Sequence, residues 1–106
     1  MSGLNEVIHQ SVRLKIMAAL NVLPPDAALE FARLKSLANA TDGNLGAHLD
    51  TLERAGYVAS EKLFVGKKPQ TRVRLTPAGR RAFAEHVAYL REILDNGAAP
   101  TTATKT

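Results

Sequence analysis

The sequence predicts a mainly α protein with one small β-hairpin, an α+β fold in which three helices precede the hairpin and one long helix follows it. Apolar residues recur at three- and four-residue spacing in four segments, which indicates amphipathic helices. Between positions 58 and 75 the pattern changes to the alternation of strands, and glycine or proline separates most segments. With 106 residues, the chain has room for one domain with a single modest core.

The first predicted helix runs from about residue 5 to residue 21. Its helical stripe consists of Val7, Ile8, Val12, Ile16, Ala19 and Leu20. Three further apolar side chains widen this surface: Leu4, Leu14 and Met17. We therefore expect the helix to contact both its own core and a partner. Pro24 and Pro25 end it, because proline lacks the N–H group that a helix requires.

Two shorter helices are predicted next. Residues 27–29 form an apolar stretch that is either one strand or the lead-in to a helix. Residues 30–38 have helical spacing, carried by Phe31, Leu34, Leu37 and Ala38. The segment Asn39-Ala40-Thr41 then breaks the pattern before a second periodic stretch begins. Two short helices joined by such a turn form a helix-turn-helix.

The second of these helices is predicted over residues 41–55. The Thr41 hydroxyl can cap its first turn, and Asp42 places a negative charge at the positive end of the helix dipole. Its buried stripe consists of Leu45, Leu49 and Leu52. Gly56 suits the left-handed position after the helix, from which Tyr57 packs back toward Leu52 in a Schellman arrangement.

A β-hairpin is predicted over residues 58–75. Residues 58–65 are rich in β-branched and aromatic side chains, and the stretch 66–70 forms the turn. In the second strand, Thr71, Val73 and Leu75 alternate with two arginines. Thr76-Pro77 then reads as an N-cap with proline at the first helical position, and opens a helix that ends at about Asp95.

Positive charge is concentrated in this hairpin. The whole chain has 14 Lys and Arg against 10 Asp and Glu, a net charge of +4 that favours polyanionic partners. The hairpin holds five basic residues and one acidic residue, Glu61; the basic ones are Lys62, Lys67, Lys68, Arg72 and Arg74. Arg72 and Arg74 share one strand face, and Lys67 and Lys68 lie at the tip, within reach of phosphates or a minor groove.

The outward face of the helix at 41–55 is the candidate reading surface. With the leucines inward, short or polar side chains face out: Gly43, Asn44, Ala47, His48 and Thr51. Such side chains suit base edges in a major groove, where asparagine can pair with adenine and alanine can meet a thymine methyl group. Gly46 would allow close approach of the backbone, or tight packing against the preceding helix.

Four stretches resemble winged-helix regulators related to the MarR and ArsR families. The stretch 44–58 (NLGAHLDTLERAGYV) is similar to their recognition helix. The stretches 62–71 (KLFVGKKPQT) and 75–80 (LTPAGR) resemble the wing of a compact subgroup and its junction, and 13–20 (RLKIMAAL) resembles its first helix. The resemblance covers roughly residues 4–94, nearly the whole folded part.

The resemblance implies a winged helix-turn-helix transcription regulator that binds double-stranded DNA as a homodimer, with repression as the expected effect. The implied base-reading residues are Asn44, Ala47, His48 and Thr51. The implied contacts to the DNA backbone are Thr41, Lys62, Lys67, Lys68, Arg72 and Arg74. Gly46 stands where the family frequently has serine, so one phosphate contact that the resemblance implies is in doubt at this position. Metal sites of the ArsR kind commonly use cysteine and do not carry over, because the chain has no cysteine.

The last helix supplies the predicted dimer interface. Four apolar residues follow spacings of four, three and four and form one seam: Phe83, Val87, Leu90 and Leu94. Packing onto the domain's own first helix is the alternative use of this seam. We expect residues 1–95 to form a winged-helix DNA-binding domain with terminal dimerisation helices, and residues 96–106 to form a flexible tail.

Other function classes find little support. The three histidines (His9, His48 and His86) show no metal-binding spacing, although His9 and His86 could meet at a helix contact. No catalytic motif or cofactor motif is present, so we expect neither an enzyme nor a cofactor. A small-molecule effector stays open, because no residue cluster identifies its site. Without a signal peptide or an apolar run of membrane length, a cytoplasmic protein is expected. The main rival is a winged helix that binds proteins and no DNA.

Overall fold

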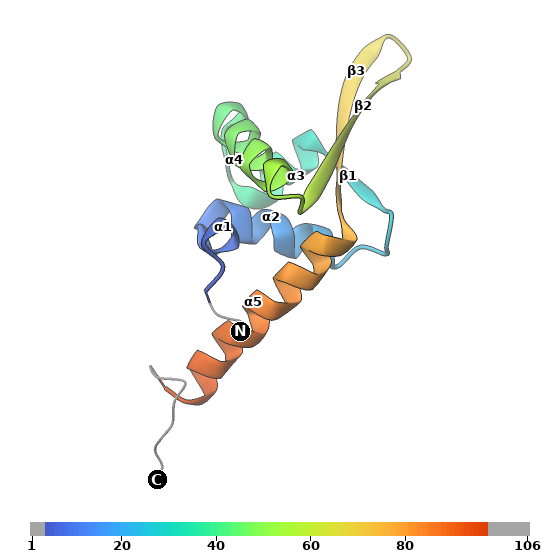
Figure 1. Cartoon of the computed structure of the whole chain (residues 1–106). Coiled ribbons are helices and arrows are strands. Elements are labelled where there is room, and N and C mark those ends of the chain that lie inside the picture. The colour runs from blue at the N-terminus through green and yellow to red at the C-terminus, as the bar shows by residue number, and fades with distance from the viewer. Residues whose placement is uncertain (1–3, 98–106) are drawn as a thin grey trace.

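The structure, a computed structural model, describes residues 4–97. Figure 1 shows a body of short helices from which a hairpin projects at one end and a long helix leaves toward the other. The elements are α1 (Glu6–His9), α2 (Ser11–Asn21), β1 (Ala28–Glu30), α3 (Phe31–Ala38), α4 (Asp42–Arg54), β2 (Val58–Val65), β3 (Lys68–Leu75) and α5 (Pro77–Asp95). This order confirms the predicted mainly α fold with a small β-hairpin.

A three-stranded antiparallel sheet in the order β1-β3-β2 joins the hairpin to the helices. Its long pair runs from Val58 opposite Leu75 to Val65 opposite Lys68. The short strand β1 pairs with the base of β3 only, with Leu29 opposite Val73. Of the two alternatives for residues 27–29, the strand is therefore the correct one, and it ties the helix-turn-helix to the wing.

The predicted first helix is wrong in one respect, because it is two helices with a break at Gln10. Gln10 has an extended backbone, with φ −62° and ψ 135°, and its side chain accepts a hydrogen bond from the Arg13 N–H. Asn5 caps α1 in the same way, accepting from the N–H groups of Val7 and Ile8. Each glutamine or asparagine side chain satisfies N–H groups that a helix start leaves free, so a corner costs little here.

The turn of the hairpin is shorter than predicted, because β3 already begins at Lys68. Only Gly66 and Lys67 connect the strands, and Gly66 has a left-handed φ of 65°. A two-residue hairpin turn of this kind needs glycine at its first position. Pro69 is tolerated inside β3 because β1 does not extend along this part of the strand, so no second neighbour requires a hydrogen bond from it.

The core lies where α2, α4, the base of the hairpin and the start of α5 meet. Its fully buried side chains include Ile8, Ile16, Met17, Leu20, Leu34, Leu45, Leu52 and Val73. Arg80 of α5 joins the end of α2 by donating from Nη1 to the Asn21 carbonyl oxygen at 3.0 Å. The positive charge thus lies at the negative end of the α2 dipole and holds the start of α5 against the end of α2.

None of the helices within residues 4–97 combines the length and apolar character that a membrane span requires. The flexible tail was predicted over residues 96–106. Only Asn96 and Gly97 of this segment are described, and the rest lies outside the described residues.

Candidate nucleic-acid interface

Helix α4, the predicted recognition helix, begins and ends as the local sequence predicts. Thr41 is its N-cap, and the Thr41 hydroxyl accepts a hydrogen bond from the Asn44 N–H at 3.1 Å. At the other end, Gly56 has a φ of 82°, and the Tyr57 N–H donates to the Leu52 carbonyl oxygen at 3.0 Å. Together with the Gly56 N–H, which donates to the Glu53 carbonyl oxygen at 2.9 Å, this second bond forms the predicted Schellman motif. The start of α4 is also tied to α3 by an ion pair between Lys35 and Asp42 at 2.8 Å.

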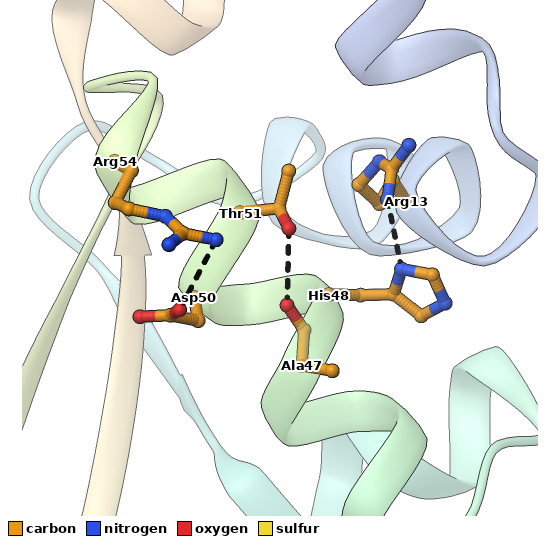
Figure 2. Close-up of polar contacts among 6 residues, drawn as sticks. All are labelled: Arg13, Ala47, His48, Asp50, Thr51 and Arg54. Carbon is orange, nitrogen blue, oxygen red and sulfur yellow. Dashed lines mark hydrogen bonds and ion pairs between the residues drawn. The ribbon is translucent and has the colours of Figure 1, made fainter.

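Three of the four predicted base-reading residues lie on the side of α4 that faces away from the core. Asn44 and Ala47 are exposed, and Thr51 is half-buried. The Thr51 hydroxyl donates to the Ala47 carbonyl oxygen at 3.2 Å, which leaves its oxygen free to accept (Figure 2). These assignments stay predictions, since their basis is position on the helix.

His48 lies on the flank of α4 next to α2, and part of its surface stays exposed. It is half-buried, and its Nδ1 lies 3.0 Å from Nη1 of Arg13 (Figure 2). Burial lowers the pKa of His48 below its ordinary value, and the positive charge of Arg13 lowers it further. The neutral ring is therefore favoured. Sequence reasoning did not find Arg13, because 35 positions separate it from His48.

Arg54 is a further candidate for contact with DNA, which the sequence predictions did not include. It lies in the last turn of α4 and is exposed, and its Nη2 is 3.3 Å from Oδ2 of Asp50 (Figure 2). Arg54 follows Ala47 by seven positions, two helical turns, so the two share the outward face. That spacing is the signal that would have revealed it. Asp50 partly neutralises this cation within the face.

Gly46 is not required by packing. A Cβ built at this position meets no atom within 4 Å. Tight packing against the preceding helix therefore does not require this glycine, and a close approach of DNA stays a prediction.

The basic residues of the wing are divided between its two faces and its tip. Val73 is buried, so its neighbours Arg72 and Arg74 both point to the opposite face, as predicted. Lys62 lies on the other face, opposite Thr71, and borders a groove with Gly46 and Asp50 of α4. Lys67 and Lys68 are exposed at the tip, where Phe64 is also 72% exposed. Two parts of the wing therefore lie on the same side of the molecule as α4: the face that carries Lys62, and the tip (Figure 1).

Arg72 has acidic neighbours on both sides. In the sheet it stands opposite Glu61 of β2 and Glu30 of β1, and cross-strand partners share a face. Its Nε donates to Gln70 Oε1 at 3.0 Å. These carboxylates reduce the positive potential around Arg72, so we rank it below Lys67 and Lys68 as a candidate for phosphate contact.

The predicted dimer seam of α5 changes character along its length. Phe83 is only 8% exposed and belongs to the chain's own core, and Val87 packs against that core. Leu90 is half-buried, and Leu94 is 79% exposed. Figure 1 shows why: the second half of α5 extends beyond the body. The first half of the seam thus packs within its own domain, as in the alternative prediction. Of the four seam residues, only those in the second half offer an uncovered apolar surface.

His9 and His86 meet between α1 and α5, with ring centroids 5.8 Å apart in an edge-to-face arrangement. His86 is 1% exposed, and its Nδ1 accepts a hydrogen bond from the Asn5 N–H at 3.3 Å. Within residues 4–97, no group of three or more metal-binding side chains is placed to hold an ion.

A capped helix-turn-helix followed by a basic two-stranded wing defines a winged-helix DNA-binding protein. Residues 12–94 match the family described as "Winged helix DNA-binding domain", and the chain belongs to this family. Its fold is that of MarR-family transcriptional regulators, and the chain is a DNA-binding transcription regulator.

Three similar proteins illustrate this relationship. "Uncharacterized protein MJ0432" of Methanocaldococcus jannaschii is 34% identical over 91 residues, which are 86% of this chain and 96% of the relative. The structure of a transcriptional regulator homologue from Pyrococcus horikoshii matches with a TM-score of 0.76 at 28% identity, over 86% of this chain and 87% of that one. A MarR-family regulator from Silicibacter pomeroyi matches with a TM-score of 0.65 at 25% identity, over 89% and 62% of the two chains.

Proposed function

We propose that the chain is a homodimeric repressor that inserts α4 into the major groove of duplex DNA and grips the flanking backbone with the wing. The main support is the common placement of α4 and the hairpin tip at one end of the molecule, opposite the second half of α5 (Figure 1). The molecule thus presents a reading helix and a cationic arm toward the same partner.

Within this proposal, each part of the surface has its own task. Asn44, Ala47, His48 and Thr51 read base edges, and Lys67 and Lys68 neutralise phosphates next to the read site. The free Thr41 hydroxyl proton and the positive end of the α4 dipole favour a further phosphate at the start of the helix. Lys62, Arg72 and Arg74 add weaker contacts.

The homodimer is supported by the uncovered second half of α5. Leu94 is exposed, and Leu90, one turn before it on the same face, is only half-buried. A second copy that covers this seam would remove apolar surface from water, which stabilises association. Two copies then place two α4 helices on one face for a partly palindromic site about one DNA turn long.

A salt titration tests DNA binding. Fluorescence anisotropy with mixed genomic duplexes should show tight binding at low salt. The logarithm of the association constant K should then decrease steeply and linearly with the logarithm of the salt concentration, because phosphate contacts release counterions. Enrichment of particular fragments from the same mixture should follow, since α4 reads bases. Absence of binding at low salt would contradict the proposal and favour a winged helix that binds proteins.

Repression is tested separately with the enriched fragments. We expect them to overlap promoters, and the protein to reduce the transcript from such a template in a purified transcription reaction. The physical basis is steric, since a bound dimer blocks polymerase without any further contact surface. An increased transcript would exclude repression and leave DNA binding intact.

A further inference from the structure

Arg13 connects three helices through one guanidinium group. It lies in the first turn of α2, its Nε donates to the Val7 carbonyl oxygen of α1, and its Nη1 lies 3.0 Å from His48 Nδ1 of α4. Figure 2 shows the His48 ring turned toward Arg13 and away from the α4 axis. Both side chains are half-buried, so water competes with this contact less than at an open surface.

The contact determines where the His48 proton resides. A guanidinium group only donates hydrogen bonds and keeps its charge at every physiological pH. His48 Nδ1 must therefore accept, which requires a neutral ring with its proton on Nε2. The tautomer opposite to this one would point two donors at each other.

We propose that Arg13 is a positioning residue for base reading: it holds His48 as the Nε2–H tautomer, so that this position of the recognition helix offers DNA a hydrogen-bond donor. The part of this inference that concerns DNA rests on the proposed function, because it takes His48 as a reader. The tautomer itself belongs to the free protein.

A fixed donor restricts the partners that His48 can select. In the major groove, guanine N7 and O6, adenine N7 and thymine O4 accept hydrogen bonds, whereas the N4 amino group of cytosine donates. His48 should therefore favour a base with an accepting edge at its position and reject cytosine there. A ring free to change tautomer would lose this discrimination.

The Val7 carbonyl oxygen gives the Arg13 side chain a second anchor. The corner at Gln10 turns α1 back so that the Val7 carbonyl oxygen reaches the Arg13 side chain, and the Gln10 side chain caps the same turn of α2 through the Arg13 N–H. Arg13 is thus held by its backbone and by its side chain.

Nitrogen NMR of the free protein, labelled at histidine, tests the tautomer directly. In the wild type we expect His48 as the Nε2–H form with a pKa below its ordinary value. In Arg13→Met, which keeps the apolar stem but removes the donor, we expect a mixture of tautomers and a higher pKa. Lys15→Met, an exposed position on the same helix, is the control and should leave His48 unchanged. A wild-type ring protonated on Nδ1 would overturn the inference without any variant.

DNA binding tests the consequence. The binding assay uses a series of duplexes that vary each base pair of an enriched site. At one base pair, the ratio of affinities between the preferred base and its alternatives should decrease about two- to ten-fold in Arg13→Met, which corresponds to the free energy of one hydrogen bond. His48→Ala should lose preference at the same base pair, and the double variant should match His48→Ala. A further loss in the double variant would show that Arg13 acts on DNA by itself and would overturn the positioning role. Unchanged preference in His48→Ala would contradict the reader role of the proposed function, whereas the NMR result would still decide whether Arg13 holds the ring.

Discussion

At Gly79 the first turn of α5 approaches the backbone of Tyr57 more closely than any side chain permits. A Cβ built on Gly79 would lie 2.0 Å from the Tyr57 carbonyl oxygen. The same oxygen accepts a hydrogen bond from the Thr76 N–H at 3.0 Å, so it cannot move away freely. The entry into α5 therefore depends on the absence of a side chain at position 79.

We expect Gly79→Ala to lower the free energy of unfolding by about 1–3 kcal/mol or more, because backbone must shift to admit the methyl group. Urea denaturation followed by circular dichroism measures this change. Gly46→Ala is the matched control, since its Cβ meets open space; it should leave stability unchanged or raise it by up to about 1 kcal/mol through helix propensity. Equal stability of Gly79→Ala and wild type would show that the junction is loose.

His86 makes stability depend on pH. Burial lowers its pKa below the ordinary value of 6.5, and the neighbouring His9 lowers it further. As pH falls below 6.5, the unfolded chain therefore binds a proton that the folded chain refuses, and the free energy of unfolding decreases. Above that pH both states are neutral at this site and the effect vanishes. The urea concentration at the midpoint of unfolding should therefore decrease as the pH is lowered from 7.5 to about 5. In His86→Gln this decrease should be smaller. An identical pH profile in the variant would assign the effect to other groups.

The wing is an element whose tip, rather than its whole length, carries the predicted phosphate contacts. We expect Lys67→Ala with Lys68→Ala to weaken binding to all duplexes and to lower the slope of log K against log salt by about 2, one counterion for each lost contact. Sequence preference should persist, since α4 is untouched. Anisotropy at several salt concentrations measures both quantities.

The control for this variant removes the same charge elsewhere. Lys15→Ala with Arg81→Ala takes two exposed cations from α2 and α5, so the net charge is equal but the wing is intact. Its slope should stay close to that of the wild type. Equal slopes for both double variants would mean that overall charge, and not the wing tip, drives the salt dependence.

Considered as a whole, the molecule has its reading surface at one end and an uncovered apolar helix at the other (Figure 1). We expect Leu94→Glu to give monomers in sedimentation velocity. Dimerisation would bury the new carboxylate, and the free energy of removing this charge from water would exceed the free energy that the apolar seam contributes to association. Stability of the monomer should change little, since Leu94 is 79% exposed in a single chain. Val22→Glu is the control, because Val22 is equally exposed but lies beside Arg80 near the start of α5, far along the helix from Leu94. A dimer that persists in Leu94→Glu would place the interface elsewhere.

Most element boundaries were predictable because they are set by residues three to five positions apart. Thr41 and Thr76 cap the helices that follow them, and Gly56 ends α4, as the sequence predicted. The break at Gln10 was missed because apolar spacing continues through it while one side-chain cap changes the backbone. Helical periodicity depends only on the spacing of apolar residues. It therefore does not detect a break between two helices when the same face stays buried on both sides of the break.

The sequence by itself determined the helix-turn-helix, the basic wing and the long last helix, since each depends on local caps, turns and periodicity. Tertiary structure alone decided that His48 is held by Arg13, that Arg72 lies between two glutamates, and that the core covers Phe83 but leaves Leu94 open. These facts join segments far apart in the chain. Which of them meet depends on how the core packs α2, α4 and α5 together, and no local pattern contains that information.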